Sequence, residues 1–152
     1  MRVLITGANG FLGYSLSALL LKKGVAVIAT GSGPCRLPFQ ENSLFRYIPM
    51  DITVPAAVHQ QIKLAAADII VHTAAMSKPD ECELHPEKAY AVNVRGTAEV
   101  LDAAAAIGIH FLFLSTDFIF DGQTGMYQEE DPPGPVNYYG QTKLEAELLT
   151  RQ

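Results

Sequence analysis

A tyrosine and a lysine near the end of this 152-residue chain have the spacing of a proton-transfer pair. Tyr139 and Lys143 are four residues apart in a helical pattern, so both side chains lie on one helix face. A nearby ammonium stabilises a phenolate and lowers the pKa of the phenol from its free value of about 10 toward neutrality. The hydroxyls of Ser115 and Thr116 follow an apolar run and add to this candidate site. The alternative is a surface pair without a role.

The first thirteen residues predict a site for the pyrophosphate of a dinucleotide. An apolar run at residues 2–6 leads into Gly7, Gly10 and Gly13, and a helical pattern follows. Gly7 allows a tight turn, Gly10 allows the backbone to approach phosphate, and Gly13 allows the helix to pack on the strand. The positive end of that helix then faces the anion. The alternative is a simple strand–helix turn.

The residues after the second apolar run favour NADP(H) over NAD(H). A dinucleotide fold often places an acid there to bind the adenosine ribose, but no acidic residue occurs between Tyr14 and Gln40. The region offers Ser32 and Arg36, and an arginine pairs with a 2′-phosphate that an acid would repel. The alternative is that Arg36 is a solvated loop charge.

Strands and helices alternate along the chain. Apolar runs predict strands at residues 2–6, 25–30, 45–49, 68–72 and 109–114, and helical patterns cover residues 14–23, 54–66, 86–106 and 138 onward. This alternation predicts a Rossmann-type α/β fold, with a doubly wound parallel sheet in strand order 3-2-1-4-5 and helices on both faces. Residues 121–137 show little periodicity and predict a long, functional or mobile loop.

The composition is that of one globular domain without nucleic-acid or membrane partners. The net charge is −5, which argues against a nucleic-acid surface, and the apolar runs are too short to span a bilayer. Cys35 and Cys82 form no C-x-x-C pair and fit a reducing, cytoplasmic setting. The four histidines are scattered without metal-ligand spacing, so no metal site is expected.

Several motifs resemble the extended short-chain dehydrogenase/reductase family. Residues 6–13 (TGANGFLG) and 139–143 (YGQTK) carry this resemblance. Within the family, the chain is most similar to the dTDP-4-dehydrorhamnose reductases, through residues 114–122 (LSTDFIFDG), residues 74–77 (AAMS), Asp80, Cys82, Glu83, Tyr127, Glu129 and Asp131. One departure is Ala75-Met76-Ser77, where those reductases mostly have Ala-Tyr-Thr.

The resemblance implies an NAD(P)H-dependent reductase of a nucleotide-activated 4-keto sugar, with a catalytic triad of Thr116, Tyr139 and Lys143. Tyr139 would protonate the substrate oxygen, Lys143 would hold the nicotinamide ribose, and Thr116 with Asp117 would orient the sugar. Asn93 matches a Val-Asn pair of the family, with either a structural or a functional role. The residues implied to bind the coenzyme are Gly7, Asn9, Gly10, Phe11, Leu12, Gly13, Ser32, Arg36, Asp51, Ile52, Ala74, Ala75, Met76, Ser77, Tyr139 and Lys143.

Two other functions stay open. One is a sugar-nucleotide epimerase or dehydratase on the same scaffold, which Thr116-Asp117-Phe118 disfavours. The other is a non-catalytic NADP-binding regulatory subunit, like the methionine adenosyltransferase β subunit. Fold alone does not separate these from a reductase.

We expect residues 1–152 to be a coenzyme-binding domain that lacks its substrate domain and does not catalyse alone. The final helical segment has no glycine or proline stop signal. The fifth strand would then be an open sheet edge, which favours self-association or a homodimer.

Overall fold

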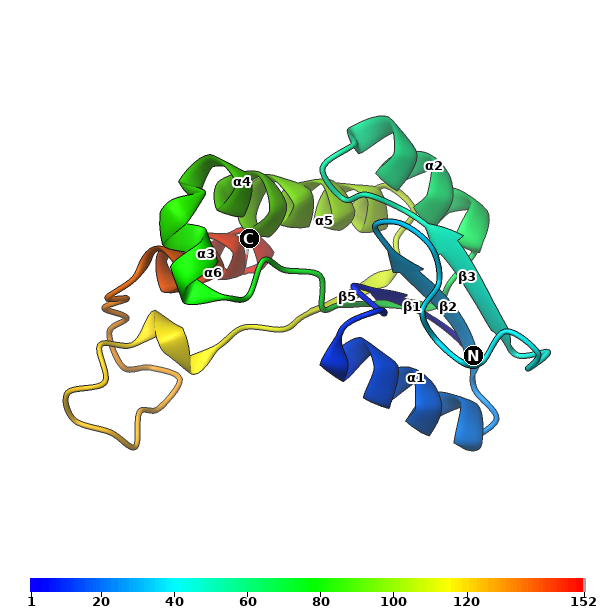
Figure 1. Ribbon diagram of the computed structural model, residues 1–152, viewed down its shortest axis with the longest axis horizontal. Coiled ribbons are helices and arrows are strands. Elements are labelled where there is room, and N and C mark those ends of the chain that lie inside the picture. Colours follow the sequence, from blue (N-terminus) through cyan, green and yellow to red (C-terminus); the bar gives the residue numbers. More distant parts are fainter. Residues whose placement is uncertain (152) are drawn as a thin grey trace.

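Five parallel strands form one sheet in the order β3-β2-β1-β4-β5 (Figure 1). The computed structural model describes residues 1–151. The strands are β1 (Arg2–Thr6), β2 (Ala26–Gly31), β3 (Phe45–Pro49), β4 (Ile69–His72) and β5 (His110–Phe113), and every neighbouring pair is parallel. The predicted fold class and strand order are confirmed, because the apolar runs are the strands buried inside such a sheet.

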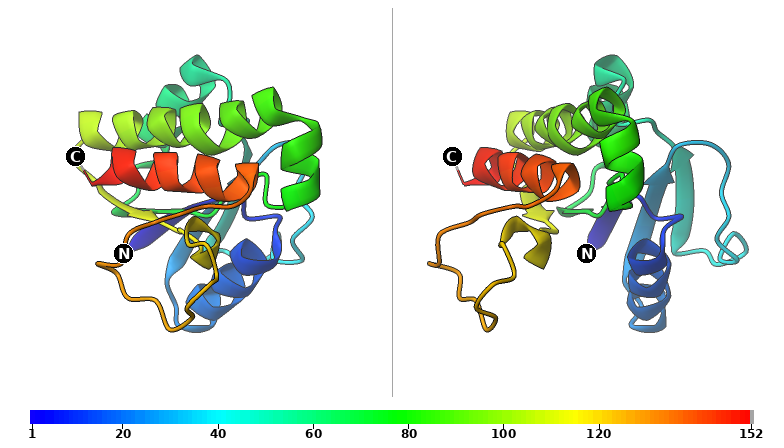
Figure 2. Two further views of the ribbon diagram at one scale, coloured as in Figure 1. Left: turned by 90° about the vertical axis from the view of Figure 1, so that its left-hand side faces the viewer. Right: turned by 60° about the vertical axis from the view of Figure 1, so that its left-hand side comes forward.

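Helices cover both faces of this sheet. They are α1 (Phe11–Lys22), α2 (Pro55–Ala65), α3 (Pro79–Leu84), α4 (Pro86–Tyr90), a π-helical turn η1 (Ala91–Arg95), α5 (Gly96–Ala106), a 3₁₀ turn η2 (Asp117–Ile119) and α6 (Tyr138–Thr150). Figures 1 and 2 show α1 on one side, α2 and α5 on the other, and α6 beside α4 and α5. No helix among residues 1–151 has the length and apolar character needed to cross a membrane.

The strands bury alternate side chains on the two faces, giving two core layers. Leu4 and Ile70 pack with Val58 and Ile62 of α2 and with Val100 of α5. On the opposite face, the core consists of Val3, Ile5, Ala8, Leu21, Val27, Ala29, Leu37 and Phe45. Burial of both faces explains why the central strands are continuous apolar runs without alternation.

Four elements differ from the sequence-based prediction. Helix α1 begins at Phe11, three residues earlier than expected, because the extended Gly10 passes directly into the helix. The helices α3 and η2 were not predicted. The helix expected at residues 86–106 is interrupted by the π-helical turn η1. The remaining boundaries differ by one residue at most, and residues 121–137 contain no helix or strand, as predicted.

Candidate functional site

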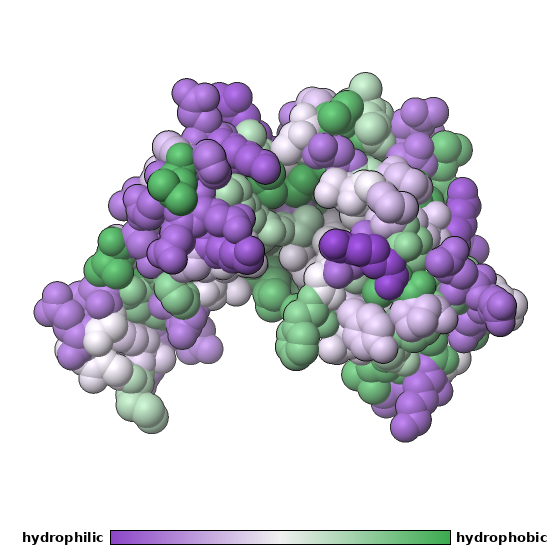
Figure 3. All heavy atoms as spheres, in the orientation of Figure 1, coloured by the Kyte–Doolittle hydropathy of each residue, from purple (hydrophilic) through white to green (hydrophobic). Residues whose placement is uncertain are grey.

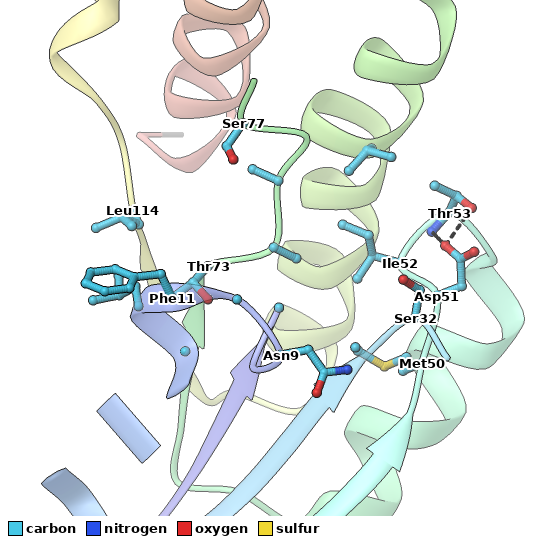
Figure 4. A pocket seen from close by; sticks show the side chains of 18 of the residues that line it. Asn9, Phe11, Ser32, Met50, Asp51, Ile52, Thr53, Thr73, Ser77 and Leu114 are labelled. Carbon is cyan, nitrogen blue, oxygen red and sulfur yellow. Dashed lines mark hydrogen bonds between the residues drawn. The ribbon is translucent and has the colours of Figure 1, made fainter. Parts of the chain in front are cut away.

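A cavity of about 810 Å³ opens at the carboxyl ends of the strands, where doubly wound sheets bind ligands. Figure 3 shows the molecule hollowed between the part that holds α3 and α6 and the part that holds α1 and β3. Side chains from the glycine turn, the strand ends, α4 and α6 line the cavity, and Figure 4 shows ten of them by name. Fifteen of the sixteen residues predicted to bind the coenzyme line it; Met76 does not.

The three glycines of the turn have different structural duties. Gly7 has a φ of +65°, and a Cβ there would lie 2.6 Å from the Cα of Ala74. A Cβ on Gly13 would lie 2.5 Å from the Cα of Ala8, so this glycine makes room for the turn itself rather than for the strand. A Cβ on Gly10 would meet only the Gly7 carbonyl oxygen, at 3.1 Å. Gly10 is therefore the one whose missing side chain chiefly leaves space in the cavity.

The N-terminus of α1 opens into the cavity and suits an anion. Gly10, Phe11 and Leu12 all line the cavity. The N-cap residue Gly10 has no side chain, so it provides no cap for the first N–H groups of this twelve-residue helix. The Phe11 side chain is 92% exposed, so it does not pack over these N–H groups. The backbone and the helix dipole thus offer a fit for the pyrophosphate of a dinucleotide.

Polar residues from the ends of β2 and β3 form one end of the cavity. Ser32, Arg36, Asp51 and Ile52 all line it, and Figure 4 shows Ser32 near Asp51 and Ile52. The Asp51 carboxylate is occupied locally, because its Oδ1 accepts hydrogen bonds from the Thr53 N–H (2.9 Å) and hydroxyl (2.7 Å). Arg36 is exposed on the rim of the cavity. This end has the hydroxyl, carboxylate and cation that an adenosine ribose and its phosphate would contact.

The buried side chain of Asn93 fixes the segment that follows β4. Its Oδ1 accepts from the Met76 N–H (2.8 Å), and its Nδ2 donates to the Met76 carbonyl (3.1 Å) and to the Thr142 hydroxyl (2.9 Å). Asn93 lies in the π-helical turn η1. Met76 is therefore held by its backbone, while its neighbours Ala75 and Ser77 face the cavity, which corrects the prediction for Met76.

A chain of buried hydroxyl and imidazole groups continues from Asn93 to β1. The Thr97 hydroxyl donates to the Asn93 carbonyl (2.6 Å) and lies 3.0 Å from Nε2 of His72. His72 Nδ1 lies 2.8 Å from the Thr6 hydroxyl. Burial, together with the positive charge of Lys143, lowers the pKa of His72 to about 3. His72 is therefore neutral and structural.

Tyr139 and Lys143 come from the first turns of α6. The Asn137 side chain caps this helix by accepting from the Gly140 N–H at 2.8 Å. Gly140 allows α6 to pack on the 3₁₀ turn, since a Cβ there would lie 2.2 Å from the carbonyl oxygen of Phe118. Tyr139 and Lys143 both line the cavity. The helix spacing places both side chains at one site, as predicted.

The Lys143 ammonium is bound to a backbone carbonyl beside β5. Its Nζ donates to the Leu114 carbonyl at 2.6 Å and lies 3.9 Å from the centre of the Phe113 ring. The side chain is only 4% exposed, and this burial lowers the pKa of Lys143 to about 8, although the Glu147 carboxylate opposes the shift. A fraction of Lys143 is therefore neutral at mildly alkaline pH.

The expected lowering of the Tyr139 pKa does not occur in this arrangement. Burial raises the pKa of Tyr139, and the Thr116 hydroxyl only partly opposes this effect. The physical reason is that the Lys143 ammonium is bound to the Leu114 carbonyl, so the phenol is desolvated without gaining a cationic neighbour. The prediction that the pKa of Tyr139 lies near neutrality is wrong, because burial raises this pKa.

Thr116 and Asp117 lie in an adjoining hollow of about 310 Å³. Ser115 borders both spaces. Thr116 accepts from the Phe118 N–H and donates to the Asp117 carboxylate, each at 3.2 Å. The hollow also contains Tyr127, Gln128, Glu129, Glu147 and Arg151. Two spaces thus adjoin at Ser115, one suited to a coenzyme and one to a second ligand.

Some lining residues were not predicted from the sequence. They are Gly31, Met50, Thr53, Thr73, Lys88, Ala91, Val92 and Leu114. Most lie next to a predicted residue at a strand end. They could have been predicted, because doubly wound sheets bind ligands at the carboxyl ends of their strands. Lys88, Ala91 and Val92 come from the helix that passes over the cavity, and local pattern gave no signal for them. Within residues 1–151, no cluster of His, Cys, Asp or Glu could hold a metal ion.

Residues 1–152 match the family described as the RmlD substrate binding domain. The chain belongs to this family. Membership of this family agrees with the resemblance to the extended short-chain dehydrogenase/reductase family. It also agrees with the parallel sheet, the glycine turn and helix α6, which carries Tyr139 and Lys143.

Two kinds of curated relatives match this RmlD domain with the same sequence identity. The bovine (Bos taurus) methionine adenosyltransferase 2 subunit beta is 38% identical over 146 residues, covering 96% of the chain and 41% of the relative. The dTDP-4-dehydrorhamnose reductase of Streptomyces griseus is 38% identical over 147 residues, covering 96% of the chain and 43% of the relative. The chain therefore spans less than half the length of these relatives.

Solved structures share the fold. A hypothetical dTDP-4-dehydrorhamnose reductase from Sulfolobus tokodaii has 37% identity and a TM-score of 0.87, covering 100% of the chain and 52% of that structure. A dTDP-4-dehydrorhamnose reductase from Bacillus anthracis, solved in complex with NADP, has 30% identity and a TM-score of 0.82, covering 99% of the chain and 49% of that structure. The RmlD domain thus has relatives of known fold that include a dinucleotide complex.

Proposed function

We propose that the chain is the coenzyme-binding part of an NAD(P)H-dependent reductase that acts on a nucleotide-activated 4-keto sugar. One observation carries this proposal: a single cavity joins the glycine turn, where a pyrophosphate fits, to Tyr139 and Lys143. The similarity to dTDP-4-dehydrorhamnose reductases supports the choice of substrate class. The adjoining hollow at Thr116 and Asp117 supports a second ligand beside Tyr139.

The residues have distinct roles in this proposal. A bound nicotinamide coenzyme supplies the hydride. The Tyr139 phenol donates a proton to the carbonyl oxygen of the sugar, and its raised pKa means that it holds this proton until the site is occupied. Thr116 and Asp117 orient the sugar. Lys143 binds the nicotinamide ribose with the N–H donors of its ammonium that the Leu114 carbonyl does not occupy.

NADP(H) is the preferred coenzyme in this proposal. Arg36 lines the cavity, and the one carboxylate at this end, Asp51, is bonded to Thr53. An arginine without an acidic competitor favours a 2′-phosphate on the adenosine ribose. Solved relatives are bound to NADP (Bacillus anthracis) or to NAD (MoeE5), so this preference rests on Arg36.

Coenzyme binding and turnover test the proposal in order. Titration of the protein with NADPH and NADH should give tighter binding of NADPH. The full-length protein should then oxidise NADPH when a 4-keto sugar nucleotide is added. Binding without turnover would refute the reductase, and absence of dinucleotide binding would refute the site itself.

The second candidate is a non-catalytic NADP-binding regulatory subunit. Two observations favour it: the identity to methionine adenosyltransferase 2 subunit beta is as high as to a reductase, and the Lys143 ammonium does not contact Tyr139. Such a subunit would bind NADPH, show no turnover, and change the activity or stability of a partner enzyme. Turnover that depends on Tyr139 separates the two candidates.

A further inference from the structure

A tyrosine outside the cavity lining holds the loop that follows β2. Tyr47 lies in β3, beside β2, and its hydroxyl is 3.1 Å from the Gly31 carbonyl oxygen and 3.0 Å from that of Gly33. One hydroxyl proton is thus shared between two acceptors. Burial raises the pKa of Tyr47, so the hydroxyl stays protonated and remains a donor at neutral pH.

Asn9 of the glycine turn holds the same loop from its other side. Its Nδ2 donates to the Pro34 carbonyl and to the Tyr47 hydroxyl, both at 3.0 Å, and its Oδ1 accepts from the Arg36 N–H at 2.9 Å. Figure 4 shows the Asn9 side chain reaching from the turn toward β2. We name Asn9 and Tyr47 the loop clamp. Together they bond to four backbone groups of residues 31–36.

The clamp connects the two ends of the coenzyme site. Asn9 lies between Gly7 and Gly10, at the place for the pyrophosphate, and the loop carries Ser32 and Arg36. Gly31 leaves space for the clamp, since a Cβ there would lie 3.1 Å from the Tyr47 hydroxyl. The clamp orders the backbone of the loop before any ligand arrives, so binding does not have to overcome the loss of loop entropy.

We propose that Asn9 and Tyr47 are positioning residues that hold Arg36 for the 2′-phosphate and thereby set the selectivity for NADPH over NADH. This inference rests on the proposed function. NADH lacks the 2′-phosphate and does not need Arg36, so loosening the loop affects NADPH binding more than NADH binding. A purely structural role would weaken both dinucleotides equally.

The Tyr47→Phe variant tests selectivity, because it removes one hydroxyl and retains the ring. Losing these hydrogen bonds should weaken NADPH binding about tenfold, while NADH binding weakens less than about threefold. Tyr14→Phe is the matched control: its ring packs on Phe39, and its hydroxyl plays no part in the clamp. The Kd ratio of NADH to NADPH should fall in Tyr47→Phe and stay constant in Tyr14→Phe.

A second measurement reports on the loop without any ligand. Arg36 is exposed, so trypsin can cut after it once the loop opens. Tryptic cleavage at Arg36 in the native protein should be several-fold faster in Tyr47→Phe, and also in Asn9→Ala, which removes the other half of the clamp. If Tyr47→Phe does not fold, Asn9→Ala supplies both measurements.

The outcomes separate the clamp from the proposed function. If the wild-type protein binds neither dinucleotide, the proposed function and its selectivity fail together, while cleavage still reports whether the loop is clamped. If the wild type prefers NADPH and the variants keep its Kd ratio, only the proposal for Asn9 and Tyr47 is overturned. Unchanged cleavage at Arg36 in the variants also overturns it.

Discussion

Burial of Lys143 should make the stability of this protein depend on pH in the alkaline range. The pKa of Lys143 is about 8 in the fold, against 10.5 as its ordinary value. Between these values the unfolded chain binds the proton more strongly than the folded chain, so the free energy of unfolding rises with pH. Integrating this difference from pH 7 to pH 10 gives a contribution of roughly 2–3 kcal/mol.

The Lys143→Met variant isolates this contribution. The methionine retains much of the side-chain volume and removes the titrating group, so the variant should lack the alkaline rise. Its stability relative to the wild type should therefore fall by roughly 2–3 kcal/mol as pH increases from 7 to 10. The loss of the hydrogen bond to Leu114 shifts this difference by a constant amount and leaves its pH dependence unchanged.

Urea unfolding curves at pH 7, 8, 9 and 10 measure the effect. Lys63→Met is the control, because Lys63 is an exposed lysine on α2. It should follow the wild type at every pH. A difference between wild type and Lys143→Met that does not change with pH would refute the reasoning, because it would mean that the ammonium is not destabilised by its burial.

Three further outcomes follow from the site. Gly10→Ala should keep the stability of the wild type and weaken NADPH binding at least about tenfold. Gly13→Ala should lose about 1–3 kcal/mol of stability in urea unfolding, because its Cβ meets backbone atoms. Equal stability of the two variants would contradict this reasoning. Tyr139→Phe in the full-length protein should keep coenzyme binding and lower kcat at least about a hundredfold, and a near wild-type kcat would show that another group supplies the proton. The pKa of His72 is about 3 in the fold, so the unfolded chain takes up the His72 proton first as pH falls below 6.5. The wild type should therefore lose about 3 kcal/mol of stability between pH 7 and pH 4. The His72→Gln variant should not show this loss.

The apolar patterns along the chain were sufficient to predict the sheet. A strand buried on both faces is a continuous apolar run, and short connections with right-handed crossovers leave few possible strand orders. The glycine turn was also predictable, because the constraints on Gly7 and Gly13 involve tight local geometry that few other residues allow. Similarly, the common face of Tyr139 and Lys143 follows directly from the helical repeat.

Tertiary structure decided what those side chains contact. Lys143 bonds to a carbonyl 29 residues away, which no helical spacing predicts, and this contact removes the expected effect on Tyr139. Asn93 interrupts the long helix, because its buried amide bonds to Met76 in another segment.

The loop clamp shows the same division most clearly. Asn9 and Tyr47 are 38 residues apart, in segments that pattern alone assigns to a turn and a strand. Which side chain meets which backbone group depends on how β3 pairs with β2 and on where the following loop passes over the sheet. Local sequence encodes backbone conformation and burial, whereas hydrogen bonds between distant segments exist only after the strands have taken their register.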